Sequence, residues 1–335
     1  MSPADFSSRP YRTLDRITGR MFMRRCHLLV LLLLVSPSLL AERHYYERGD
    51  QRLEIDLSEQ LPRSQREDVL GWIRDTADAM AAVHGRWPRD VWRVRVQPYS
   101  TRGSDPVPWA QVNRGNPDVV RFYIDPRASR ARLSNNWTAY HEFAHLLIPY
   151  RGWGDMWFSE GFASYYQNLL QARHGIFDER EMWQRLHDGF IRGRTNRRPD
   201  LSLAELSPSM RENRSFMRVY WSGAWYWFRA DTELRRRSGG AQSVDTALAA
   251  LNRCCADSAM SAREIAVELD RLTGQLLFVP LFDQVAGSRA LPPFEEQFAE
   301  LGIELDNGAV SLRKAHPLAG IRTAIARPAE LPDGR

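Results

Sequence analysis

The sequence predicts an α+β protein, in which a small mixed sheet with helices is followed by a mainly helical lobe. Residues 52–57 alternate between apolar and charged side chains, as in a half-buried strand, and 91–96 and 119–124 also read as strands. After residue 131, apolar residues recur at helical spacing through most of the chain. A chain of 335 residues that is 43% hydrophobic can bury a core of this size.

One helix is expected among these strands. Residues 64–84 place apolar side chains near helical spacing, and Gly85 and Pro88 then end the helix. Helix and strands together predict an α/β layer that leads into the second half of the chain.

The first 41 residues are typical of a secretory signal peptide or a membrane anchor. Two arginines precede an apolar run at 28–35, which is shorter than the roughly 20 residues of a membrane-spanning helix. Leu39 is a poor residue for the position two before a cleavage site at Ala41. The alternative that the segment is not cleaved and acts as a membrane anchor is therefore left open. The residues before Met21 are polar and rich in arginine, unlike a leader, so we expect translation to begin at Met21 or Met23. A periplasmic or secreted protein is expected, either free or tethered to the membrane by this segment.

The charge of the chain argues against a nucleic-acid partner. The net charge is +5, of which the first 41 residues contribute +4 through six arginines and two aspartates. The remainder is therefore close to neutral, and it shows no basic stripe interleaved with aromatic residues.

Two adjacent cysteines follow the leader, Cys254 and Cys255. Neighbouring cysteines rarely bridge each other, because the small ring resists ordinary disulfide geometry. In an oxidising compartment they would pair between chains or form that rare vicinal bridge. The sequence offers them no further metal ligand, so we interpret them as structural or incidental.

The stretch from 140 to 170 carries the chemistry. His141 and His145 are four residues apart, so on a helix they project from one face and can hold one Zn²⁺ between them. Glu142 lies beside them and can reach a water molecule on the metal. A catalytic zinc site needs a third protein ligand and an open position, and Glu160 is the best candidate for that ligand. The alternative is an exposed helix with two ordinary histidines, which the surrounding apolar pattern disfavours.

Two helices are predicted to carry this motif. The first should begin near residues 134–136, which are good N-cap residues, and end before Pro149. The second should begin near Asp155 or Ser159 and run to about residue 173. Gly161 beside Glu160 allows a close approach of the backbone to the metal, or merely a tight contact between helices.

The rest of the chain is predicted to be helical, at 182–191, 217–237, from a capping box at Ser261 and Glu264, and at 292–301. This gives four parts, a leader (1–41), an α/β lobe (42–130), a helical lobe that carries the zinc motif (131–312) and a loosely ordered tail (313–335).

The segments HEFAH and WFSEGFASYY resemble the gluzincin zinc metallopeptidases, especially the aminopeptidase N-like and glycyl-aminopeptidase-like catalytic domains. The resemblance covers roughly residues 137 to 305. At its end, residues 301–305 resemble part of the last helices of the glycyl-aminopeptidase-like domains. It implies a thermolysin-like zincin fold in which His141, His145 and Glu160 bind one Zn²⁺ and Glu142 is the general base. Tyr220 stands where a tyrosine of that group helps to stabilise the transition state; its spacing alone favours a core residue.

By the same analogy, an edge strand of the sheet would line the cleft and pair with an extended substrate, at 108–112 or 119–123. The sequence lacks a Gly-x-Met-x-Asn-like segment that would receive a substrate's amino terminus. We therefore expect a zinc metallopeptidase that acts on a peptide or protein, with end-trimming and internal cleavage both open. The alternatives are an inactive zinc-binding scaffold and a peptide-binding protein of the cell envelope.

Overall fold

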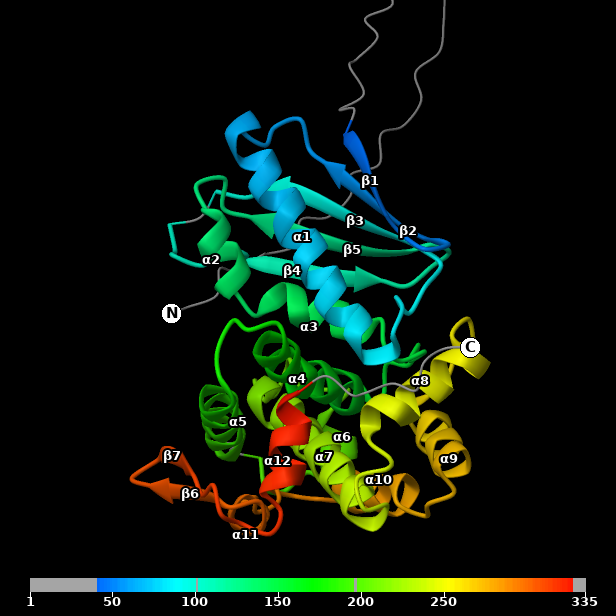
Figure 1. Ribbon diagram of the computed structural model, residues 1–335, viewed down its shortest axis with the longest axis vertical. Coiled ribbons are helices and arrows are strands. Elements are labelled where there is room, and N and C mark those ends of the chain that lie inside the picture. The colour runs from blue at the N-terminus through cyan, green and yellow to red at the C-terminus, as the bar shows by residue number, and fades with distance from the viewer. Residues whose placement is uncertain (1–40, 101, 196–197, 328–335) are drawn as a thin grey trace, which may run out of the picture. The chain divides into compact units, whose positions relative to one another are not determined.

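The structure is a computed structural model that describes residues 41–100, 102–195 and 198–327, all within one structural unit spanning 39–335 (Figure 1). Except for residue 41, the predicted leader lies outside the described residues, and so does the end of the predicted tail. Among the described residues, no helix combines the length and the apolar character needed to cross a membrane.

A mixed five-stranded sheet forms the first part of this unit, in the order β1-β2-β3-β5-β4. β2 pairs in parallel with β3 and β3 with β5, whereas the outer strands β1 and β4 pair antiparallel with their neighbours. The strands are β1 (Glu42–Arg48), β2 (Gln51–Leu57), β3 (Val91–Pro98), β4 (Trp109–Asn113) and β5 (Asp118–Ile124). Of the two rim candidates, 108–112 therefore overlaps an edge strand, whereas 119–123 lies inside the sheet.

Helix α1 (Arg63–His84) crosses one face of this sheet (Figure 1). Its buried residues are mostly apolar, among them Trp72 and Ile73. Trp72 of α1 meets Phe122 of β5 edge-to-face, with 5.1 Å between the ring centroids. Gly85 ends the helix in the left-handed conformation, at φ 75°, which glycine adopts at little cost. The predicted helix at 64–84 and the three predicted strands are confirmed.

The rest of the unit is mainly helical, which confirms the predicted α+β class. Its helices are α2 (Arg130–Asn135), α3 (Thr138–His145), α4 (Met156–Arg173), α5 (Glu179–Arg194), α6 (Leu203–Leu206), α7 (Phe216–Arg237), α8 (Val244–Cys255), α9 (Ala262–Thr273), α10 (Phe278–Ala286), α11 (Glu295–Glu300) and α12 (Ala319–Ala326). A hairpin of β6 (Ile303–Asp306) and β7 (Ala309–Leu312) interrupts them.

The helix predicted to start near 134–136 is α3, which begins slightly later, and a separate short helix, α2, precedes it. α2 ends at Asn135 and α3 begins at Thr138, whose backbone N–H donates to the Asn136 side chain at 2.9 Å. Phe143 fixes α3 to the sheet, because its ring packs edge-to-face on Trp92 of β3 at 4.9 Å. The histidine-bearing helix is thus short and is anchored from the sheet side.

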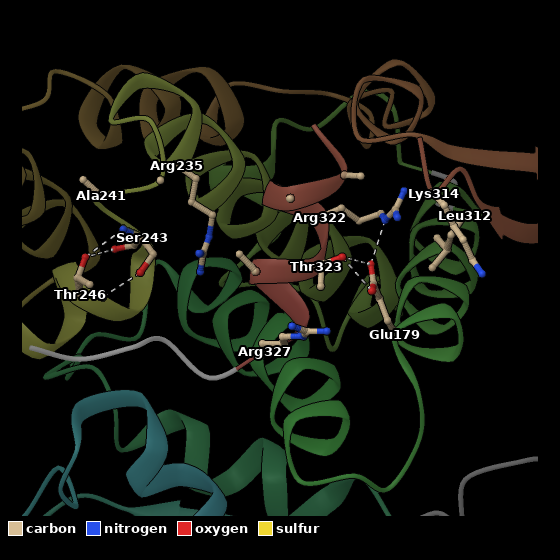
Figure 2. Close-up of a pocket in the computed structure, with 14 residues that line it drawn as sticks. Glu179, Arg235, Ala241, Ser243, Thr246, Leu312, Lys314, Arg322, Thr323 and Arg327 are labelled. Atoms are coloured by element: carbon tan, nitrogen blue, oxygen red, sulfur yellow. Dashed lines mark hydrogen bonds and ion pairs between the residues drawn. The ribbon is translucent and has the colours of Figure 1, made fainter. Parts of the chain in front are cut away.

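Two predictions for the C-terminal part are wrong. Residues 301–305 were expected to belong to a helix, but strand β6 begins at Ile303. Residues 319–326 lie in the segment expected to be loosely ordered, yet they form α12, where Arg322 is only 4% exposed. Figure 2 shows why: Arg322 donates to Glu179 of α5 at 2.9 Å, and Thr323 donates to the same carboxylate at 3.1 Å.

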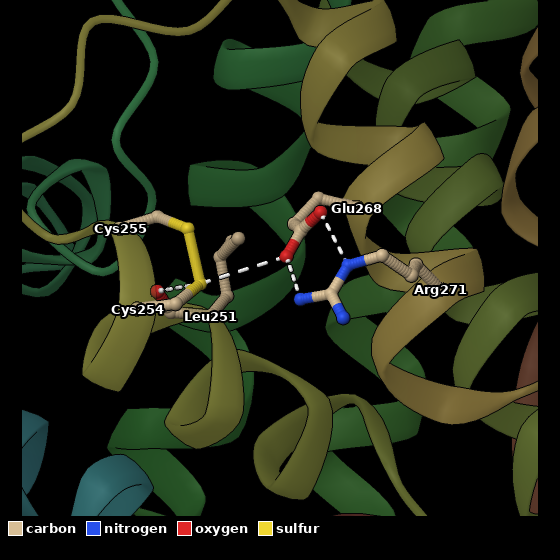
Figure 3. Close-up of a disulfide and its surroundings, with 5 residues drawn as sticks. All are labelled: Leu251, Cys254, Cys255, Glu268 and Arg271. Atoms are coloured by element: carbon tan, nitrogen blue, oxygen red, sulfur yellow. Dashed lines mark hydrogen bonds and ion pairs between the residues drawn. A yellow bond between two sulfur atoms is a disulfide. The ribbon is translucent and has the colours of Figure 1, made fainter.

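The two cysteines form a vicinal disulfide at the end of α8 (Figure 3). Of the alternatives left open, the bridge within the chain is the one present. Glu268 of α9 lies 3.7 Å from the Cys254 sulfur, a neighbour that the sequence did not indicate, and Arg271 pairs with this carboxylate. With both sulfurs bonded to each other, this group offers no thiolate to a metal.

Candidate functional site

Three of the predicted site residues meet where α3 faces the start of α4. One carboxylate oxygen of Glu160 lies 3.1 Å from His141 Nε2 and 3.7 Å from His145 Nε2. One donor atom from each residue lies within 4.8 Å of the other two. His141 is 4% exposed and His145 is 9% exposed, so both residues are buried.

A second layer of side chains orients the two imidazoles. His141 Nδ1 lies 2.8 Å from the Gln167 side-chain oxygen, and His145 Nδ1 lies 3.0 Å from the Ser159 hydroxyl. When Nδ1 donates to these oxygens, the proton is held on that side of each ring, and the Nε2 lone pairs face Glu160.

The backbone of α3 is braced as well. Arg114, in the turn between β4 and β5, donates to the carbonyl oxygens of His145 and, at 3.0 Å, of Ile148. Asp118 holds this guanidinium at 3.2 Å, and a cation at the C-terminal end of a helix also offsets the helix dipole. Burial lowers the pKa of Arg114 to about 10, so the group stays charged at neutral pH.

The donor set fits a tetrahedral zinc ion. Ligands about 2.0–2.1 Å from Zn²⁺ at tetrahedral angles are roughly 3.3 Å apart, close to the separations of Glu160 from the two imidazoles. Two neutral imidazoles and one carboxylate are also the ligand set of catalytic zinc sites that keep a position open for water. His141, His145 and Glu160 could therefore hold such an ion.

Glu142 is largely shielded from water beside these donors. Burial and the charge of Glu160 raise the pKa of Glu142 to about 7, against the opposing effect of His141. A carboxyl group that exchanges its proton near neutral pH suits general acid–base chemistry. For Glu160, burial is outweighed by His145, His141 and Tyr220, so the pKa of Glu160 lies below its ordinary value.

Tyr220 of α7 reaches the same centre. Its ring stacks beside the His141 imidazole with 6.1 Å between centroids, and its hydroxyl lies close enough to Glu160 for the carboxylate to affect its pKa. Burial, followed by the charge of Glu160, raises the pKa of Tyr220, so its hydroxyl remains a donor at neutral pH. The structure thus brings together all five predicted site residues; their chemical roles stay predictions.

Sequence reasoning missed Ser159, Gln167 and Arg114. Gln167 lies seven residues after Glu160, two turns along the same helix face, so its spacing was a usable signal. Arg114 had no such signal, because its contact with His145 joins residues 31 apart that only the folded sheet brings together.

Comparisons with known proteins agree with this geometry. A model of the M61 glycyl aminopeptidase family matches residues 153–233, a range that includes Glu160 and Tyr220. Comparison with curated proteins yields no match.

Several solved structures share the fold. An aminopeptidase N family protein from Idiomarina loihiensis superposes with a TM-score of 0.59 at 13% identity, over 82% of this chain and 53% of that one. An M1 zinc metallopeptidase from Deinococcus radiodurans, solved with a Tyr-Ser-Ala substrate, gives a TM-score of 0.50 at 19% identity, over 75% of this chain and 53% of that one. Yeast LTA4 hydrolase superposes with a TM-score of 0.50 at 12% identity, over 75% of this chain and 40% of that one. The chain therefore spans about half the length of the first two structures, and less of the third.

The fold and the site together define the class. The chain has a gluzincin aminopeptidase-like fold, which confirms the resemblance seen in the sequence. The family match over residues 153–233 and the shared fold agree with each other, and the His-His-Glu cluster is one that could hold a metal ion such as zinc.

Proposed function

We propose that the chain is a zinc-dependent metallopeptidase that hydrolyses peptide bonds with one Zn²⁺ held by His141, His145 and Glu160. One observation carries this proposal. Donor atoms of His141, His145 and Glu160 converge at a spacing that suits a tetrahedral metal, and Glu142 interacts electrostatically with His141 and Glu160 of this group.

The side chains divide the chemistry among them. When bound, Zn²⁺ supplies a Lewis acid that lowers the pKa of a water molecule and polarises a peptide carbonyl. Glu142 accepts the proton of the attacking water and returns it to the leaving amine. Tyr220 donates its hydroxyl hydrogen to the oxyanion that develops on the substrate, a contribution of roughly 3 kcal/mol for donors of this kind.

Strand β4 is the proposed binding edge for the substrate backbone. It is an outer strand of the sheet, and one of its sides pairs with β5. An extended peptide can add to such an edge through main-chain hydrogen bonds. This mode requires no free amino terminus, so internal cleavage and end-trimming are both compatible with it.

The location is proposed to be the periplasm or the exterior of the cell. The basic start and apolar run of the N-terminal segment support this location. The disulfide between Cys254 and Cys255 also supports it, because such bridges persist mainly in oxidising compartments.

The test combines metal analysis with peptide digestion. Purified protein should contain about one zinc per chain by elemental mass spectrometry, and a mixed peptide library should be cut in its presence. Glu142→Gln should keep the metal and lose nearly all hydrolysis, because the amide cannot accept the proton. Glu304→Gln, on β6 away from the site, is the matched control and should remain active.

The outcomes separate the candidate functions. Full hydrolysis by Glu142→Gln would remove the proposed role of that residue. Zinc without turnover on any peptide would favour an inactive scaffold, and protein without zinc would favour an envelope peptide-binding protein. Fragment ends read by mass spectrometry would distinguish removal of terminal residues from internal cleavage.

A further inference from the structure

A pocket adjoins the proposed metal site on the side of α5. Its volume is about 370 Å³, and it is lined at one end by His141 and Tyr220. Along its other wall lie Arg185, Asp188 and Arg192, which follow one another at intervals of three and four residues on α5. That spacing places all three side chains on one face of the helix.

Two glycines let this face of α5 come close to α7. A Cβ atom on Gly189 would lie 2.1 Å from the Trp221 ring, and one on Gly193 would lie 2.8 Å from Trp221 Cβ. A larger residue at either position would require the Trp221 side chain or the helices to shift, so the two glycines set how closely α5 approaches α7. The charged residues between and beside these glycines are therefore held at the pocket wall.

Two of the three charges already have partners. Arg185 pairs with Glu181 at 3.0 Å, and the Asp188 carboxylate accepts hydrogen bonds from Gln184 at 2.9 Å and from the His187 ring at 3.0 Å.

Arg192 is different, because within the described parts of the chain it has no ion pair with a carboxylate. Its guanidinium lies over the Trp221 indole at 5.1 Å from the ring centroid. An indole face attracts a guanidinium at this distance, and a guanidinium can bind two carboxylate oxygens at once through its N–H groups. The pocket beside the metal site therefore offers one cation that, among the described residues, has no carboxylate partner.

We propose that Arg192 binds a carboxylate of the peptide substrate, so that the site prefers peptides with an acidic side chain or a free carboxyl terminus close to the cleaved bond. The proposal rests on the proposed peptidase function and adds to it a substrate class. Because the pocket is lined by both Tyr220 and Arg192, a peptide reacting at the metal would place a neighbouring residue within it.

The test uses alanine pentapeptides that carry Glu, Gln or Lys at one position, each made as a free acid and as a C-terminal amide. We expect kcat/KM for the best-placed Glu peptide to exceed that of its Gln counterpart about tenfold, as a charge-assisted hydrogen bond predicts. Arg192→Gln should abolish this preference. Arg180→Gln removes the same charge from an exposed position of α5 and should keep it.

The peptide series also identifies the source of the carboxylate. Preference for Glu in the amides indicates an acidic side chain, whereas preference for free acids over amides indicates the carboxyl terminus. Equal cleavage of all forms, or an unchanged preference in Arg192→Gln, overturns the proposal. A preference for Lys would also overturn it and would point to Asp188 as the binding group.

A binding measurement keeps this proposal separate from the peptidase assignment. Affinities of the same peptides for zinc-loaded Glu142→Gln protein, measured by calorimetry, report recognition without turnover. If the wild-type protein cuts no peptide, the peptidase assignment fails, and the affinities still decide the role of Arg192. The expected Glu-over-Gln difference should shrink in 0.5 M NaCl, because exposed charge pairs are screened at about that ionic strength.

Discussion

Gly161 of α4 and Gly223 of α7 touch backbone to backbone. A Cβ atom added to Gly161 would lie 2.2 Å from the Cα atom of Gly223, and one added to Gly223 would lie 1.8 Å from the Trp157 carbonyl oxygen. Of the two interpretations of Gly161, the structure therefore supports the tight contact between helices. The contact also places Tyr220, one turn before Gly223, over Glu160, the residue before Gly161.

Gly223→Ala is expected to separate these helices. The methyl group meets backbone atoms that cannot rotate away, so the free energy of unfolding should fall by at least about 2 kcal/mol. Urea denaturation measures this loss, and zinc affinity should fall with it as Tyr220 and Glu160 move apart. Gly320→Ala is the control, because a Cβ at that position on α12 has no neighbour within 4 Å. Equal stability of the two variants would contradict the contact.

Tyr220→Phe is expected to lower kcat by about 100-fold while zinc content and KM change little. The reason is that the hydroxyl is proposed to serve the oxyanion, a group that exists only in the transition state. Steady-state kinetics on a cleaved peptide measures the effect. In Tyr226→Phe, on the same helix, a hydroxyl that donates to the Phe278 carbonyl is lost, so stability should fall instead of kcat. A loss of zinc with unchanged kcat would instead indicate that Tyr220 positions the ligand Glu160 and does not serve the oxyanion.

How much of this site the sequence could predict depends on how far apart in the sequence the contacting residues lie. His141 and His145 are related by one helical turn, which local periodicity fixes, and the positions of Glu142 and Glu160 follow from the same two helices. Arg114 and Arg192 instead depend on which surfaces pack together. No local pattern encodes the placement of α5 against Trp221 or of the β4–β5 turn against α3.

The errors in the predicted fold have different origins. β1 was missed because it is an outer strand with little buried surface, so polar residues such as Arg43 and Glu47 obscure its pattern. α12 owes its order to Arg322 binding Glu179, a residue 143 positions earlier. The β6–β7 hairpin differs from both, because Asn307 and Gly308 form a two-residue turn with φ of 48° and 83°, a signal that was present in the sequence.

Gln167→Leu is expected to weaken zinc binding by about 10- to 100-fold, because the His141 ring loses the acceptor that orients it. Competition with a fluorescent chelator measures the affinity. Gln171→Leu is a matched control one turn further along α4, where the side chain donates to the Asn135 carbonyl at 3.4 Å. An equal loss of zinc affinity in both variants would show a general effect of α4 stability and contradict the specific role of Gln167.

Arg114→Gln is expected to lower the free energy of unfolding by about 3 kcal/mol and to weaken zinc binding. The change leaves the His145 and Ile148 carbonyls without their donor and removes a buried partner of Asp118. Arg151→Gln is the control, since Arg151 also lies near Asp118, at 3.5 Å, and is more exposed. Urea denaturation and zinc competition compare the two variants. An equal loss of zinc affinity in both would show that the loss of a partner for Asp118, and not the loss of the donor to the α3 carbonyls, weakens zinc binding.

His84 predicts how stability depends on pH. Both of its ring nitrogens are shielded from solvent and lack a hydrogen-bond partner among the described residues. Burial lowers the pKa of His84 from 6.5 to about 4, with nearby Asp245 opposing the shift and Arg253 and Arg86 adding to it. Well above pH 6.5, as at pH 8, the ring is neutral in both the folded and the unfolded chain, so its protonation no longer contributes to the pH dependence of stability.

Below pH 6.5 the unfolded chain takes up a proton that the folded chain refuses, so stability falls until the folded pKa is reached near pH 4. At pH 5 the loss should be about 2 kcal/mol relative to pH 8. His84→Gln removes this term, so its free energy of unfolding should decline less between pH 8 and pH 5. Chemical denaturation with a chelator present measures both proteins without the pH dependence of metal binding. Parallel curves for the two would show that His84 is protonated equally in both states, in conflict with its burial.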